Sequence, residues 1–308
     1  MTEPERAERE RRAGFACASL VLFIWSGFIL VSRAGATGVL TGWDLAALRH
    51  AVAFAVLSPF AAGGSLAAVP WAQAVALALF AGLGFPLCAY AGFSLAPAAH
   101  GAVLLPGALP FATALVARLW LGERVGRERA LSLGLVAVGI ACLAGVGFLD
   151  TPGAWRGDLL FLAGTTSWAV FTLLVRRWGV TAIEATVAVG TVSAPLYLPV
   201  WSLFLPSRIT QASVGEIAFQ GAYQGGLAMV IASLLYTRAL VALGPVRLGF
   251  FTAVVPALAA VAAWPILGEA LGPSAMLGAL LVTAGMLHGV LRGSGPGPER
   301  VDAPTPRT

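Results

Sequence analysis

The chain alternates long apolar segments with short polar or Gly/Pro-rich segments. Each apolar segment spans about 20 residues, the length that an α-helix needs to cross roughly 30 Å of hydrocarbon. The two-residue alternation typical of β-barrel strands is not seen in these segments. The pattern predicts an all-α integral membrane protein with ten transmembrane helices. The predicted spans are 13–32, 44–62, 72–93, 99–120, 130–148, 158–175, 183–205, 216–240, 247–267 and 273–291.

Composition supports this prediction and excludes a water-soluble domain. Of 308 residues, 58% are hydrophobic and only 11% are charged, too few to cover a soluble surface. The 19 basic residues are all arginines, and they stand singly or in pairs at the ends of the apolar segments. This arrangement is typical of topology signals and not of a nucleic-acid-binding patch. We therefore expect the lipid bilayer, and no nucleic acid, as a partner.

The distribution of arginine predicts the orientation of the helices. With an inside N-terminus, fifteen of the 19 arginines fall at inside ends or in the two tails, and four fall outside. Because positive charge is enriched on the cytoplasmic side, both termini are predicted to be cytoplasmic, in a multi-pass protein of the cell membrane. Residues 1–12 are predicted to form a cytoplasmic tail. Residues 293–308, rich in Pro, Gly and charge, are predicted to form a disordered cytoplasmic tail.

An internal repeat divides the chain. Pro110 precedes Glu123 by the same interval as Pro256 precedes Glu269, which gives an offset of 146 residues. Tyr90 and Tyr236 share this offset, and Trp25 and Trp168 correspond at an offset of 143. Each half, 13–149 and 150–292, holds five spans. Because five is odd, the second half must enter the membrane from the opposite side, which predicts an inverted repeat of the kind found in secondary transporters.

Three short motifs carry a family resemblance. They are Leu121-Gly122-Glu123-Arg124 after the fourth span, Leu267-Gly268-Glu269 after the ninth, and Leu45-Ala46-Ala47-Leu48-Arg49 in the second. Together with ten spans in two halves, they resemble the drug/metabolite transporter superfamily, EamA type, over about residues 13–292. The resemblance implies alternating-access transport, in the export direction, of a small metabolite, an amino-acid-like or a drug-like solute. The second half departs from the pattern, since it has no equivalent of Arg49 and Ala270 follows Glu269.

Two other classes of function fit the sequence less well. An intramembrane enzyme would need paired aspartates at membrane depth or a zinc-binding His-Glu-x-x-His, and the sequence contains neither. A receptor or structural protein without transport would not account for the inverted halves. The sequence has no phosphate-binding loop for ATP and no metal-ligand spacing, so we expect no cofactor and no catalytic residue. A homodimer through the fifth and tenth helices is compatible with their small-residue faces.

Several polar and aromatic residues inside the helices are candidates to bind substrate in a central cavity. The Arg49 guanidinium is expected either to hold an anionic or carbonyl group of a substrate or to extend to the outer interface. The aromatic candidates either line the cavity or belong to an interfacial belt. The candidate substrate-binding residues are Trp25, Ser26, Arg49, Tyr90, Ser167, Trp168, Gln224 and Tyr236.

Prolines and helix-end charges form two further groups. Pro106, Pro110 and Pro256 are expected to act as hinges, with static kinks as the alternative. Glu123, Arg124 and Glu269 are expected to anchor or gate the helix ends, with substrate contact as the alternative. Gly221 and Gly225 stand four residues apart, which predicts close helix packing. No acidic residue falls clearly at mid-depth, so the sequence offers no evident proton carrier.

Overall fold

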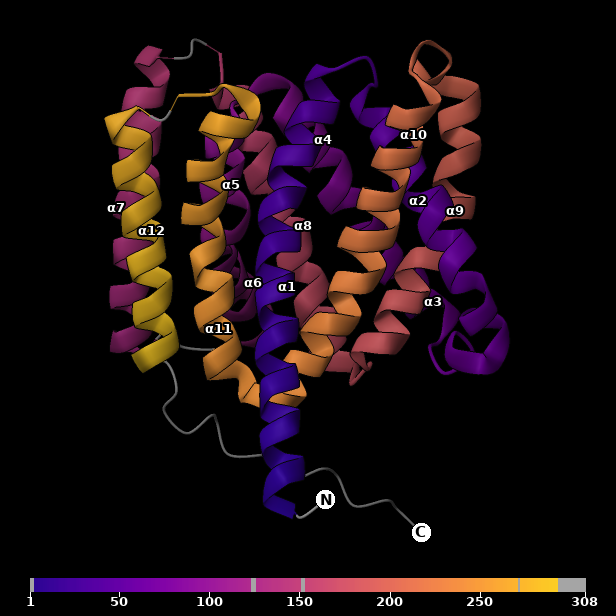
Figure 1. Cartoon of the computed structure of the whole chain (residues 1–308), viewed down its shortest axis with the longest axis horizontal. Helices are drawn as coiled ribbons and strands as arrows, with labels where there is room; N and C mark the ends of the chain where they lie inside the picture. Colours follow the sequence, from indigo (N-terminus) through magenta and orange to yellow (C-terminus); the bar gives the residue numbers. More distant parts are fainter. Residues whose placement is uncertain (1–2, 123–125, 151–152, 271, 293–308) are drawn as a thin grey trace.

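The computed structural model describes residues 3–122, 126–150, 153–270 and 272–292, and over these ranges it is helical and contains no strand (Figure 1). Nine described segments are long and apolar enough to cross a membrane, and Ala130–Cys142 is a shorter apolar helix. The all-helical membrane fold predicted from the sequence is therefore confirmed.

The first half holds the elements of five crossings. Its first helix is longer than predicted, and its third and fourth crossings are each built from more than one element. The elements are α1 (Glu3–Thr37), α2 (Gly42–Phe60) with η1 (Ala61–Ser65), α3 (Trp71–Leu77) with η2 (Ala78–Gly84) and α4 (Phe85–Leu95), α5 (Ala98–Gly107) with α6 (Leu109–Leu121), and α7 (Arg127–Asp150).

The second half repeats this order. Its eighth crossing turns at Gly244, whose φ of 76° breaks the helix, and the chain returns as the ninth within the same element. The elements are α8 (Trp155–Trp178), α9 (Ala182–Phe204), η3 (Ile209–Gln211), α10 (Val214–Gly221) with η4 (Ala222–Ile231), α11 (Ala232–Leu267) and α12 (Pro273–Arg292).

Local sequence explains the ends of several helices. α2 and α9, the second helices of the two halves, both begin with a capping box, Thr41 with Asp44 and Thr181 with Glu184. In each box the side chains satisfy backbone amides that have no partner within the helix. α6 and α11 end at Gly122 and Gly268, which adopt left-handed φ angles of 68° and 70°. Glycine adopts this conformation without a Cβ clash, which explains the repeated Leu-Gly-Glu motif.

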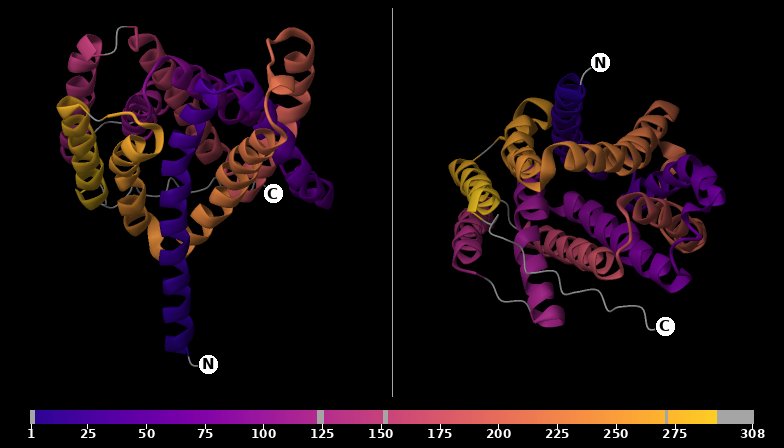
Figure 2. Two further views of the ribbon diagram at one scale, coloured as in Figure 1. Left: turned by 45° about the horizontal axis from the view of Figure 1, so that its top comes forward. Right: turned by 90° about the horizontal axis from the view of Figure 1, so that it is seen from below.

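The N-terminal helix extends beyond the predicted span. α1 begins at Glu3, within the segment 1–12 that the sequence predicted as a tail. Glu8 forms ion pairs with Arg11 at 2.6 Å and Arg12 at 3.0 Å, three and four residues later. Such pairs stabilise a helix that has no apolar face to bury. The result is a helix that projects from the bundle at the N-terminal end (Figures 1 and 2).

Contacts between helix ends show that the two halves run in opposite directions. Glu269, after α11, contacts Arg33 near the end of α1 and the backbone amide of Ala98 at the start of α5. His100, also near the start of α5, contacts Asp158 near the start of α8. The first helix of one half therefore ends at the face where the first helix of the other begins (Figure 1). We name this side the Glu269 face.

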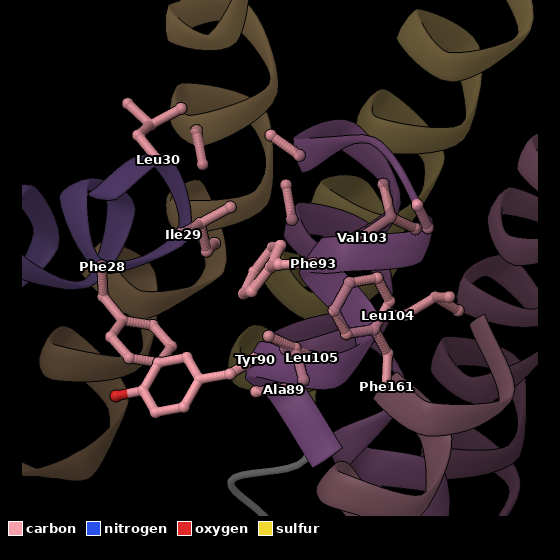
Figure 3. Close-up of a cluster of buried hydrophobic side chains, with 14 of the residues drawn as sticks. Phe28, Ile29, Leu30, Ala89, Tyr90, Phe93, Val103, Leu104, Leu105 and Phe161 are labelled. Carbon is pink, nitrogen blue, oxygen red and sulfur yellow. The ribbon is translucent and has the colours of Figure 1, made fainter. Parts of the chain in front are cut away.

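The main core lies between helices of both halves. Phe28 of α1 packs near Tyr90 of α4, while Phe93 of α4 meets Phe161 of α8 with ring centroids 4.8 Å apart (Figure 3). Phe93 and Phe161 are fully buried, and their contact joins α4 to α8 beneath the Glu269 face.

Candidate substrate-binding site

Arg49 of α2 is buried within the bundle, with 6% of the residue exposed. Its Nη1 donates a hydrogen bond of 3.1 Å to the carbonyl oxygen of Gln224 in η4, and its guanidinium lies 5.8 Å from the centroid of the Phe28 ring. Its Nε has no hydrogen-bond partner. The side chain is thus held inside the protein, whereas one of the two sequence-based interpretations placed it at the outer interface.

A glycine in η4 allows this contact. A Cβ on Gly225 would lie 2.6 Å from the carbonyl oxygen of Arg49 and 2.7 Å from Cβ of Val52. Such distances are too short for real side chains, so only glycine lets η4 approach α2 this closely. The close packing predicted from Gly221 and Gly225 is confirmed at Gly225, and it brings the backbone of the second half within reach of Arg49.

Gln224 is the centre of a buried hydrogen-bond network. Its Oε1 accepts from the Tyr90 hydroxyl at 3.1 Å, and its Nε2 donates to Ser32 Oγ at 3.2 Å and to Gln220 Oε1 at 3.3 Å. Gln220 in turn donates to the carbonyl oxygen of Val31 at 3.2 Å. The network joins α1, α2 and α4 of the first half to α10 and η4 of the second. We call Arg49, Tyr90, Gln224, Ser32 and Gln220 the central polar network.

Sequence reasoning found three members of this network and missed two. Ser32 was overlooked because it lies near the predicted end of the first span. Gln220 was overlooked as a single amide near the start of the eighth. The signal that could have identified Gln220 is its four-residue spacing from Gln224, which places both amides on one helix face.

Aromatic rings adjoin the central polar network through Phe28, which lies beside Arg49 and Tyr90. Phe28 neighbours Phe85 at 6.1 Å between ring centroids, and Phe85 neighbours Trp168 of α8 at 5.0 Å. Trp25 of α1 stacks on Tyr236 of α11 with centroids 5.3 Å apart. Trp25 and Trp168, the repeat-related tryptophans, therefore both contact aromatic rings within the bundle.

The two serine candidates have different surroundings. Ser167 of α8 donates a hydrogen bond of 2.8 Å to the carbonyl oxygen of Phe80, which ties α8 to η2. Ser26 of α1 is buried and its hydroxyl has no hydrogen-bond partner. Ser26 thus has hydrogen-bonding capacity to spare, whereas the hydroxyl of Ser167 already has an acceptor.

Asp44, the acidic residue nearest to Arg49 along α2, is fully engaged elsewhere. Its Oδ2 accepts from the amide and hydroxyl of Thr41 and from the amide of Arg208. Its Oδ1 accepts from Trp201 Nε1 at 3.0 Å and Ser207 Oγ at 2.5 Å. This carboxylate fixes the loop after α9 to the start of α2. No local sequence pattern indicated this role, because Trp201, Ser207 and Arg208 lie more than 150 residues away along the chain.

Two polar contacts close the Glu269 face. Glu269 Oε1 lies 2.6 Å from Arg33 Nε, and Glu269 Oε2 accepts from the Ala98 amide at 2.7 Å. His100 Nδ1 lies 2.8 Å from Asp158 Oδ1. Both contacts join the first half to the second, above the central polar network. The repeat-related Glu123, and Arg124 beside it, lie outside the described residues.

The prolines have different surroundings in the two halves. The fourth crossing breaks between α5 and α6 at Ala108, with Pro106 before the break and Pro110 after it. The carbonyl oxygens of Leu104 and Leu105 accept from the Thr165 hydroxyl of α8 at 3.3 and 3.2 Å. In the second half, helix continues from Arg247 to Leu267 through Pro256. The two repeat-related prolines therefore differ, since the helix is interrupted at Ala108 beside Pro110 but is continuous through Pro256.

A pocket of about 390 Å³ lies away from the central polar network. It is lined by Trp120, Leu174, Arg177 and Trp178, at the ends of α6 and α8 opposite the Glu269 face. Among the described residues, no group of three or more His, Cys, Asp or Glu side chains is placed to hold a metal ion.

Comparison with known proteins agrees with this architecture. The EamA-like transporter family matches residues 12–145 and again residues 155–288. The "uncharacterized transporter YyaM" of Bacillus subtilis (strain 168) is 24% identical over 233 residues, which cover 71% of this chain and 73% of YyaM. A solved crystal structure superposes with a TM-score of 0.61 at 23% identity, covering 92% of this chain and 96% of the other, and shows a shared fold. The double match to one family confirms the resemblance seen in the sequence motifs: this chain is a multi-pass membrane protein that belongs to the EamA-like transporter family.

Proposed function

We propose that the protein is an alternating-access exporter of a small organic solute, which binds at the central polar network. The observation that carries the proposal is the position of this network. It is buried, it is built from both inverted halves, and it lies beneath a face closed by polar contacts. Inverted-repeat transporters bind their substrates at the interface of the repeats, near the middle of the membrane.

The contacts suggest how the two states interconvert. Opening at the Glu269 face requires Glu269 to separate from Arg33 and the Ala98 amide, and His100 to separate from Asp158. Each separation moves an element of one half away from the other, so the halves can rock about the central polar network. The break at Ala108, between Pro106 and Pro110, is a suitable place for the fourth crossing to bend during this motion.

The proposed orientation and location rest on charge. The helix ends opposite the Glu269 face carry most of the arginines near the membrane boundary, and positive charge marks the cytoplasmic side. We therefore place the Glu269 face outside, the termini in the cytoplasm and the protein in the cell membrane. The arginines at these ends are Arg118, Arg127, Arg176, Arg177, Arg238, Arg247 and Arg292.

Efflux measurement in cells tests this function. Cells that express the wild-type chain, the Arg49→Ala variant or an empty vector are compared for the release of a panel of labelled metabolites. Wild-type cells should release at least one compound faster, and Arg49→Ala should abolish the difference at unchanged membrane abundance. Arg156→Ala is the matched control, because Arg156 likewise lies over an aromatic ring, that of Trp155 at 5.5 Å, but away from the network. Full efflux with Arg49→Ala would refute the assigned site.

A further inference from the structure

Arg49 is a buried cation whose contacts in the described part of the chain are neutral. Those contacts include the Gln224 carbonyl oxygen, the Phe28 ring and the Tyr90 hydroxyl, and no described carboxylate forms an ion pair with its guanidinium. A buried charge is costly unless it is paired and fully hydrogen-bonded. The buried guanidinium of Arg49 therefore lacks the favourable interaction that a negatively charged partner would provide.

From this we infer that the transported solute carries a carboxylate, and that Arg49 supplies its countercharge. The inference rests on the proposed function and specifies its substrate class. Asp44, the acidic residue of α2, forms no ion pair with Arg49, and its oxygens accept instead from five donors of Thr41, Trp201, Ser207 and Arg208. The positive charge of Arg49 thus remains available to an anion from outside the chain.

The free atoms of the site suit a carboxylate. Arg49 Nε is buried without a hydrogen-bond partner, while Nη1 is held by Gln224. An arginine presents its N–H groups in a planar fork that matches the two oxygens of a carboxylate, and the contact with Gln224 fixes the orientation of this fork.

The surroundings of Arg49 favour an apolar body for the same solute. Phe28 lies beside the guanidinium, and Phe85 and Trp168 extend from Phe28 as a row of neighbouring rings. Aromatic rings accept flat apolar groups by offset or edge-to-face contact. The ligand class is therefore an organic monoanion with one carboxylate and an aromatic or similar apolar body, without need of a positively charged group.

Binding of three matched probes to the purified full-length protein tests this inference. Phenylacetate, phenylacetamide and phenethylamine share the ring and differ in charge, which is negative, neutral and positive at pH 7. Isothermal titration should show that phenylacetate binds about tenfold or more tightly than the amide, the gain expected when a hydrogen bond becomes charge-assisted. Phenethylamine should bind more weakly than the amide. Arg49→Gln should remove the preference for phenylacetate, and Arg156→Gln should preserve it.

The wild-type protein alone can overturn the inference. Equal or tighter binding of phenethylamine, no preference for phenylacetate over the amide, or no binding of any probe would each contradict it. Arg49→Lys, which keeps the charge without the planar fork, provides a second variant if Arg49→Gln does not fold, and it should retain part of the preference. Exchange of labelled phenylacetate in proteoliposomes separates the two proposals. Selective binding of phenylacetate without exchange would refute transport and support the anion site. Exchange of phenethylamine alone would support transport and refute the anion site.

Discussion

The contact between Glu269 and Arg33 should control how often the Glu269 face opens. Both side chains are largely buried, with 23% and 18% of their area exposed, and the Nε–Oε1 distance is 2.6 Å. In the Glu269→Gln variant an amide oxygen can still accept one hydrogen bond, but the charge is lost. A charge-assisted hydrogen bond contributes about 1.5–3 kcal/mol, so the closed state should be weakened by about this amount.

That free energy corresponds to a population of the open state about 10- to 150-fold larger. The assay uses a chain whose cysteines, Cys17, Cys88 and Cys142, are replaced by alanine and which carries Ala102→Cys. Ala102 is fully buried, one turn of α5 below the Glu269 contact at Ala98, so a membrane-impermeant maleimide reaches it only when this face opens. Adding Glu269→Gln should raise the labelling rate by the same factor.

Two controls make this result interpretable. Leu95→Cys, at the end of α4 where Leu95 is 47% exposed, should label at the same rate with or without Glu269→Gln. Arg33→Gln should accelerate labelling at Ala102→Cys, and the double variant should add little, because both changes remove the same contact. An unchanged labelling rate at Ala102→Cys in the Glu269→Gln protein would refute the gating role.

Three further predictions concern stability and the polar network. Asp44→Asn should lower the free energy of unfolding by about 1.5–3 kcal/mol, because it removes the negative charge that accepts from five donors, and a thermal melt should show this loss. Glu184→Gln, in the equivalent capping box of α9, should lower the melting temperature much less. Equal losses in the two variants would contradict the reasoning. Gly225→Ala should cost about 1–3 kcal/mol by overpacking α2. Gly226→Ala should be neutral in the same melt, because its Cβ would lie 4.0 Å from Cγ1 of Val52. Gln224→Leu should abolish efflux and lower the free energy of unfolding by about 1–3 kcal/mol, since it leaves the buried hydroxyls of Tyr90 and Ser32 without their partner. Efflux at the wild-type rate would exclude Gln224 from the site.

The general architecture could be predicted from the sequence because bilayer thickness constrains every span. Apolar segments of about 20 residues, the arginine pattern and the offset of 146 residues between the Leu-Gly-Glu motifs indicated helices, their ends and the repeat. Helix continuity was less predictable. The break at Gly244 lies between the predicted spans 216–240 and 247–267, whereas the helical extension of α1 to Glu3 falls within the predicted tail and is supported by the Glu8 ion pairs.

The candidate site was only partly predictable, because its key contacts join distant segments. Arg49, Tyr90 and Gln224 were chosen from their residue types at membrane depth, yet the sequence could not show that one glutamine contacts all of Tyr90, Ser32 and Arg49. The pair of His100 and Asp158 is separated by 58 residues and has no sequence signature. Such contacts arise from the packing of helices from both halves, which no local pattern encodes.

The most direct test of the account is a paired distance measurement by double electron–electron resonance. Spin labels on Thr37 and Trp155 report on the Glu269 face, and labels on Leu119 and Arg177 report on the opposite face, each pair joining the two halves. If the halves rock about the central polar network, Glu269→Gln should lengthen the first distance and shorten the second in the same population of molecules. Distances that change together, or that do not change at either face, would contradict alternating access.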